Sequence, residues 1–82
     1  MDILNISKRL EDKLISNGYC GQRIGSGCTV NGHPVRDFQY YYSEKKPTEE
    51  IVSKYLKDIS PLYVARLKLR DDNFSVYVEE IS

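Results

Sequence analysis

Two stretches of the chain repeat their apolar residues at the spacing of an α-helix. In the first, four residues share one face: Ile3, Ile6, Leu10 and Leu14. Spacings of three and four residues are typical of a helix that packs one side against a core. Charged residues occupy the rest of its surface: Lys8, Arg9, Glu11, Asp12 and Lys13. The pattern predicts a helix that begins near residues 2–5 and ends at Asn17-Gly18, because Gly18 suits the left-handed position after a helix end.

The second helical stretch has clear start and stop signals. Thr48 can cap its first turn, where the negative charges of Glu49 and Glu50 are favourable. Its apolar face consists of Ile51, Val52, Tyr55, Leu56 and Ile59. Ser60-Pro61 follows at once, and proline cannot continue a helix.

Four further segments have the composition of β-strands. Residues 35–42, 62–70 and 74–81 are rich in aromatic and β-branched side chains, with a tight turn predicted over residues 71–73. Residues 19–30 contain glycines at positions 21, 25 and 27 and predict an irregular, bulged strand. A phosphate-binding loop would instead run from a strand through glycines into a helix, and this segment follows a helix.

The dipeptide Asn31-Gly32 predicts a hairpin between residues 19–30 and 35–42. A two-residue loop would pair Val30 with His33 and set the apolar faces of the two strands in conflict. A three-residue loop over residues 31–33 pairs Val30 with Pro34 and brings Cys28 to the side of Phe38 and Tyr40. We favour the three-residue loop, which leaves His33 at the hairpin tip in solvent.

The order of elements is helix-strand-strand, twice. Right-handed connections through the helices give a four-stranded antiparallel sheet in the strand order 1-2-4-3, with both helices on one face. The predicted class is therefore α+β with an αββαββ arrangement. It resembles in topology a ferredoxin-like βαββαβ domain whose first strand has moved to the end of the chain.

Composition limits the function classes. The 82 residues suit a single domain, 1–82, and carry 12 basic and 12 acidic side chains, so bulk charge does not direct the chain to nucleic acid. No apolar run approaches the ~20 residues of a membrane span, and the N-terminus lacks an apolar signal core. We expect a cytoplasmic protein.

Cysteine and histidine are too few to indicate a metal site. Cys20, Cys28 and His33 are the only residues of these two types, whereas a zinc site takes about four ligands. We interpret the cysteines as free thiols and expect no metal, no cofactor and no catalytic residue. Cys28 and His33 would be diagonal neighbours only in the two-residue register, roughly 7–8 Å apart at Cα, which does not make a nucleophile–base pair.

The face of the sheet opposite the helices is the candidate binding surface. Alternation along the strands assigns to it Arg23, Asp37, Gln39, Tyr41, Val64, Arg66, Lys68, Arg70, Tyr77 and Glu79. We select six of these as candidate partner-binding residues: Gln39, Tyr41, Arg66, Lys68, Arg70 and Tyr77. Tyr40 and Tyr42 alternate with Tyr41, so we expect both to face the helices, with hydroxyls that reach the rim of the core.

Several functions fit such a face. Tyrosine and arginine are enriched in protein-binding hot spots, which favours a non-catalytic protein that occupies a partner protein's surface. Inhibitors, adaptors and immunity-type proteins, including those encoded by phage and mobile elements, are often of this size and class. The alternative is a single-stranded nucleic-acid-binding module, in which tyrosines stack on bases and basic residues meet phosphates. The same residues also occur on ordinary exposed strands, and an edge strand could pair with a second copy to form a homodimer.

Overall fold

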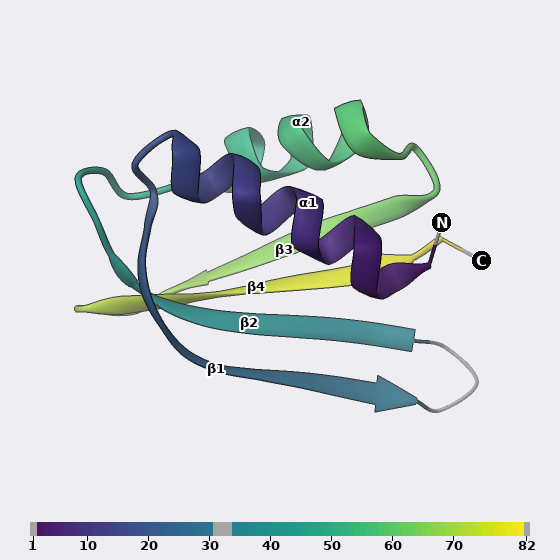
Figure 1. Cartoon of the computed structure of the whole chain (residues 1–82), viewed down its shortest axis with the longest axis horizontal. Helices are drawn as coiled ribbons and strands as arrows, with labels where there is room; N and C mark the ends of the chain where they lie inside the picture. Colours follow the sequence, from purple (N-terminus) through teal and green to yellow (C-terminus); the bar gives the residue numbers. More distant parts are fainter. Residues whose placement is uncertain (1, 31–33, 82) are drawn as a thin grey trace.

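The computed structural model describes residues 2–30 and 34–81, with the backbone alone at residues 28–30 and 34. The elements follow in the order α1 (Ile3–Ser16), β1 (Cys20–Val30), β2 (Pro34–Tyr42), α2 (Glu49–Ile59), β3 (Tyr63–Leu69) and β4 (Asn73–Glu80). The strands form one antiparallel sheet in the order β1-β2-β4-β3, and both helices lie on the same side of it (Figure 1). This confirms the predicted α+β class, strand order and helix placement.

The position of β4 between β2 and β3 gives the fold its likeness to a ferredoxin-like domain. Each helix leads into an antiparallel pair of strands, and β2 joins the two halves by pairing with β4. A βαββαβ chain whose first strand is moved to the end has the same arrangement. Right-handed connections place both helices on one face, and no described element covers the other (Figure 1).

Both helices have capped ends. Asp2 Oδ1 accepts a hydrogen bond from the Asn5 N–H at 2.9 Å and begins α1, and Thr48 Oγ1 accepts from the Ile51 N–H at 3.2 Å and begins α2. The end of α1 turns through Gly18, whose φ of 81° is unfavourable for other residues. The Tyr19 N–H then donates to the Leu14 carbonyl at 3.0 Å, which closes the helix end.

The core lies between the helices and the inner face of the sheet. The helices contribute Ile6, Leu10, Leu14, Val52 and Leu56, and the sheet contributes Cys20, Phe38, Tyr40, Ala65, Phe74, Val76 and Val78. Phe74 packs at its centre, with ring centroids 5.5 Å from Tyr40 and 5.3 Å from Tyr42. Burial of each large apolar side chain contributes about 1.5–3 kcal/mol. Tyr40, Tyr42 and Phe74 therefore pack in or against the core, as the alternation along β2 and β4 predicted.

Two irregularities interrupt the pairing of β1 with β2. They fall between Cys20 and Arg23 and between Arg23 and Gly25, which confirms the predicted bulged strand. If the pairing register of residues 25–30 also held before Gly25, Arg23 would lie opposite Tyr41 on the open face. The shift places Arg23 opposite Tyr40 instead, on the helix side. The prediction that Arg23 lies on the open face is therefore wrong, because one inserted residue reverses the alternation of a strand.

Beyond the bulges the pairing is regular. Val30 pairs with Pro34, as the favoured register requires, and Cys28 pairs with Arg36. The predicted loop over residues 31–33, with His33 at its tip, lies outside the described residues, and so does the side chain of Cys28.

Gly21 and Gly25, two glycines of β1, should respond oppositely to alanine. A Cβ atom at Gly21 would lie 2.9 Å from the Tyr42 carbonyl oxygen, whereas one at Gly25 would meet nothing within 4 Å. We expect Gly21→Ala to lower the free energy of unfolding by about 1–3 kcal/mol, because backbone must move to relieve the contact. Gly25→Ala should leave it unchanged or raise it by about 0.4–1 kcal/mol. Urea unfolding followed by circular dichroism measures both, and equal stabilities of the two variants would contradict the bulged geometry.

Candidate functional site

The open face of the sheet carries all six candidate binding residues. Cross-strand pairing arranges this face in rows across β2, β4 and β3: Asp37–Tyr77–Arg66, then Gln39–Ser75–Lys68, then Tyr41–Asn73. Arg70 follows β3 and reaches the same face through its contact with Ser75. Tyr41 is 44% exposed, and the basic side chains of β3 are also exposed. Their positions agree with the predicted face, and their role in binding stays a prediction.

A polar network fixes the middle of this face. Arg70 Nη1 donates to Ser75 Oγ at 2.9 Å and to Asn73 Oδ1 at 3.4 Å. Gln39 Nε2 donates to the same Asn73 oxygen at 2.9 Å. Ser75 is only 5% exposed, although it lies on the open side of the sheet. Hydrogen bonds within the chain therefore hold the centre of the face in place.

A shallow hollow of about 400 Å³ lies between this network and β1. Its lining consists of Gly25, Ser26, Gly27, Asp37, Gln39, Arg70, Ser75 and Tyr77. The hollow exists because Gly25 and Gly27 pair with Gln39 and Asp37 but have no side chains to fill the space beside them. The sequence analysis missed it, since it treated these glycines only as a source of irregular backbone. Glycines at alternate positions, which share one face of a strand, were the available signal.

Asp37 forms one wall of the hollow. Its carboxylate lies over Gly27, so close that an added Cβ atom there would be 2.5 Å from Oδ1. Asp37 Oδ1 is buried and has no hydrogen-bond partner among the described residues. Buried acceptors are nearly always hydrogen-bonded, so this oxygen is an exception, and the carboxylate that carries it also lines the hollow.

Tyr41 and Tyr77 lie on neighbouring strands but not side by side. Tyr41 pairs with Asn73, and Tyr77 follows Asn73 by four residues along β4. At a rise of ~3.4 Å per residue the two tyrosines are separated by roughly 14 Å along the strands. They cannot stack together on neighbouring bases.

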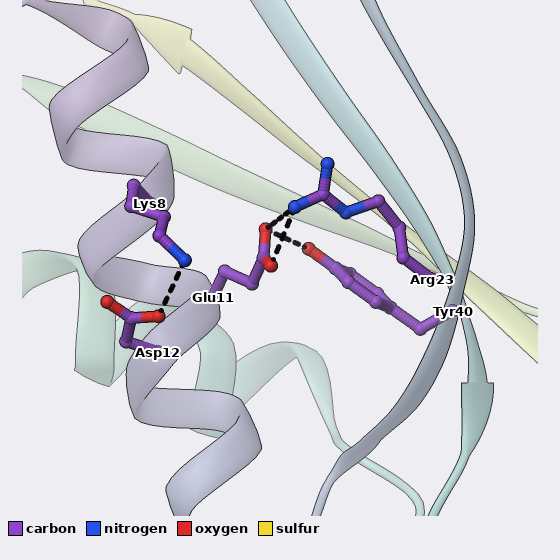
Figure 2. Close-up of polar contacts among 5 residues, drawn as sticks. All are labelled: Lys8, Glu11, Asp12, Arg23 and Tyr40. Carbon is purple, nitrogen blue, oxygen red and sulfur yellow. Dashed lines mark hydrogen bonds and ion pairs between the residues drawn. The ribbon is translucent and has the colours of Figure 1, made fainter.

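A second polar cluster lies on the covered side, between α1 and the sheet. Figure 2 shows the Glu11 side chain pointing from α1 toward Arg23 and Tyr40, away from the surface pair Lys8–Asp12. Arg23 Nη2 donates to Glu11 Oε1 at 3.0 Å and to Oε2 at 3.3 Å, and the Tyr40 hydroxyl donates to Oε2 at 3.0 Å. Glu11 is only 5% exposed. The expectation that the Tyr40 hydroxyl reaches the rim of the core is wrong, because the hydroxyl is buried against this carboxylate.

This cluster does not provide a nucleophile. Burial, and then the charge of Glu11, raise the pKa of the Cys20 thiol to about 12. Burial and Glu11 also raise the pKa of the Tyr40 hydroxyl above its ordinary value. Both groups therefore stay protonated at neutral pH, and a thiol rather than a thiolate is unreactive. The arrangement ties α1 to β1 and β2, and Cys20 is a free, buried cysteine as expected.

Residues 2–30 and 34–81 contain no group of three or more histidine, cysteine, aspartate or glutamate side chains that could hold a metal ion. In the same part of the chain, neither helix has the length and hydropathy needed to cross a membrane. Comparison of the chain with protein-family models, with curated proteins and with solved structures finds no match.

Removing Arg23, whose partner Glu11 is buried, should destabilise the fold far more than removing a basic residue whose acidic partner is exposed. Arg23→Gln leaves the buried Glu11 carboxylate with Tyr40 alone, and loss of a partner to a buried polar group costs about 1–3 kcal/mol. The matched control is Lys8→Gln, which removes the ion pair to Asp12 at 3.1 Å between two exposed side chains. Such pairs contribute about 0–1 kcal/mol. Chemical denaturation gives both values, and an Arg23→Gln variant as stable as Lys8→Gln would disprove the structural role of the cluster.

Stability should fall at alkaline pH through Cys20. Its thiol has a pKa of about 12 in the fold and 9.0 as a free group, so the unfolded chain loses the proton first. The stability of the fold that depends on a protonated Cys20 is intact below pH 9 and is lost as the pH rises from 9 toward 12. The thiol should add up to about 1.3 kcal/mol per pH unit to the decline. Denaturation of wild type and Cys20→Ala across this range isolates it, and parallel pH profiles would contradict the burial of the thiol.

Proposed function

We propose that the protein is a non-catalytic binding protein that acts by occupying the surface of a partner protein, as an inhibitor, adaptor or immunity-type protein does. The observation that supports this best is the gathering of Gln39, Tyr41, Arg66, Lys68, Arg70 and Tyr77 on the one side of the sheet that the helices leave uncovered. A cytoplasmic location and the absence of a cofactor belong to the same proposal.

The composition and rigidity of the face favour a protein partner. Tyrosine and arginine contribute disproportionately to protein interfaces, and residues held on strands lose little freedom when they bind. The face also carries both signs of charge, since Arg66 lies in the same row as Asp37. A partner protein can match such a mixed pattern with its own charges, which gives specificity.

Binding of single-stranded nucleic acid is the second candidate function. It is supported by three exposed basic side chains on β3 and just after it: Arg66, Lys68 and Arg70. Two observations make it weaker. The separation of Tyr41 from Tyr77 denies neighbouring bases a shared stacking platform, and Asp37 would repel a phosphate backbone that crosses the face.

Partner capture should depend on the open face. The tagged protein, cross-linked in its native host, should recover partner proteins that the double variant Tyr41→Ala/Arg66→Ala recovers at least about tenfold less well, as expected for loss of two hot-spot residues. The matched control is Glu50→Ala/Lys54→Ala, which changes two exposed residues of α2 and should capture like wild type. Thermal melts verify that all variants fold. Equal recovery by both double variants would exclude the sheet face as the contact surface.

Fluorescence anisotropy with labelled single strands separates the two candidates. Binding at low salt that weakens steeply as salt is added, and that Arg66→Ala and Lys68→Ala reduce, would favour the nucleic-acid function. We expect no binding even at low salt.

A further inference from the structure

We infer that the partner contributes an extended segment that pairs with the free edge of β1 and places a lysine or arginine side chain in the hollow beside Asp37. This inference rests on the proposed function, because it names how a partner protein would use the open face. Three features of β1 carry it: its edge, its glycines and the carboxylate beside them.

The two edges of the sheet differ in their protection. β1 and β3 are the outer strands (Figure 1). The β3 edge presents Arg66 and Lys68, and charged side chains are a common device against unwanted strand pairing. Between Gly25 and Gly27 the β1 edge has no charged side chain, because the one side chain there is that of Ser26. Its outward N–H and C=O groups are therefore open to an added strand.

The hollow lies directly inside this edge. Alternate side chains of a strand added to β1 would point to the open face next to Gly25 and Gly27. The Asp37 carboxylate lies over Gly27, but nothing lies within 4 Å of a Cβ added at Gly25, so such a group can extend across Gly25 toward Asp37. Main-chain hydrogen bonds would then supply affinity, and the hollow would select the side chain.

The charge of the hollow selects a cation at its β1 end. The Asp37 carboxylate lines the hollow, and an ammonium or guanidinium group there would supply both a donor and the opposite charge. The positive group that also lines the hollow, Arg70, is held at its far side by Ser75 and Asn73. An acidic side chain would meet the Asp37 carboxylate, so a basic one is preferred.

A second copy of the chain fits less well. Symmetric pairing of β1 with β1 about Ser26 would bring Gly25 and Gly27 of the second copy, and no basic side chain, to the hollow. Symmetric pairing of β3 with β3 would bring Arg66 and Lys68 near their own copies. Pairing of β3 with the β1 edge of another copy would supply a cation, but repetition of that contact makes open-ended chains.

Selection from a display library of short random peptides tests the inference on the full chain. The enriched peptides should share one lysine or arginine flanked by β-branched or aromatic residues. They should bind Asp37→Asn at least about tenfold more weakly, as expected for loss of a charge-assisted hydrogen bond. They should also lose binding to Gly25→Val, which places a side chain in the hollow at a position where an added Cβ meets nothing within 4 Å. Hydrogen exchange should show that the bound peptide protects amides of β1. Glu50→Ala/Lys54→Ala should bind like wild type.

The possible failures can be told apart. Peptides that lack a basic residue, or that bind Asp37→Asn and Gly25→Val as tightly as wild type, overturn the inference, and so does a library that yields no enriched peptide. If the enriched peptides bind Asp37→Asn and Gly25→Val like wild type but bind Tyr41→Ala/Arg66→Ala weakly, the proposed sheet-face function stands without the β1 edge. Peptides that bind every variant equally overturn both. A mass in solution that rises with concentration, and that Arg66→Ala abolishes, would assign the edge to a second copy and so overturn the inference.

Discussion

The carboxylate of Glu11 holds the outer part of the sheet against α1. It accepts hydrogen bonds from Arg23 on β1 and Tyr40 on β2, and it is almost fully buried. A buried charge that loses its partner is strongly unfavourable, and Glu11 is the buried member of this pair. The contact therefore favours the one register in which Arg23 faces the helix. Beyond Arg23 the strand resumes with Gly25 and Gly27 on the open side, and the hollow depends on that alternation.

Much of the fold could be predicted from the sequence because its signals are local. The stripe from Ile51 to Ile59, the cap at Thr48 and the glycine at 18 define the helices, and the handedness of the connections then leaves one strand order. The side of Arg23 could not be predicted, because a bulge within a glycine-rich strand has no fixed sequence signal. Glu11 lay among charged residues in the pattern, and only its contact with Tyr40, 29 positions along the chain, brings it inside.

One part of the candidate site, the open face, could be predicted from the sequence, and the other part, the hollow, could not. Alternation along β2, β3 and β4 was enough to place five of the six candidate residues, since these strands pair without interruption. Arg70, just after β3, reaches the same face through its hydrogen bond to Ser75. Predicting the hollow required the pairing register between β1 and β2. Gly27 is informative only because it pairs with Asp37 on β2. Absence of a side chain becomes a feature of the surface when the neighbouring strands provide walls.

The placement of β4 has a consequence for how the chain folds. Each half can form its own hairpin early, because β1 is followed directly by β2 and β3 directly by β4. The sheet becomes continuous only when β2 meets β4, a contact between segments far apart along the chain. Closing so long a loop is slow, since its entropy is lost before the new contacts form. We expect the meeting of the two halves to set the folding rate, with Phe74 docking between Tyr40 and Tyr42 as they join.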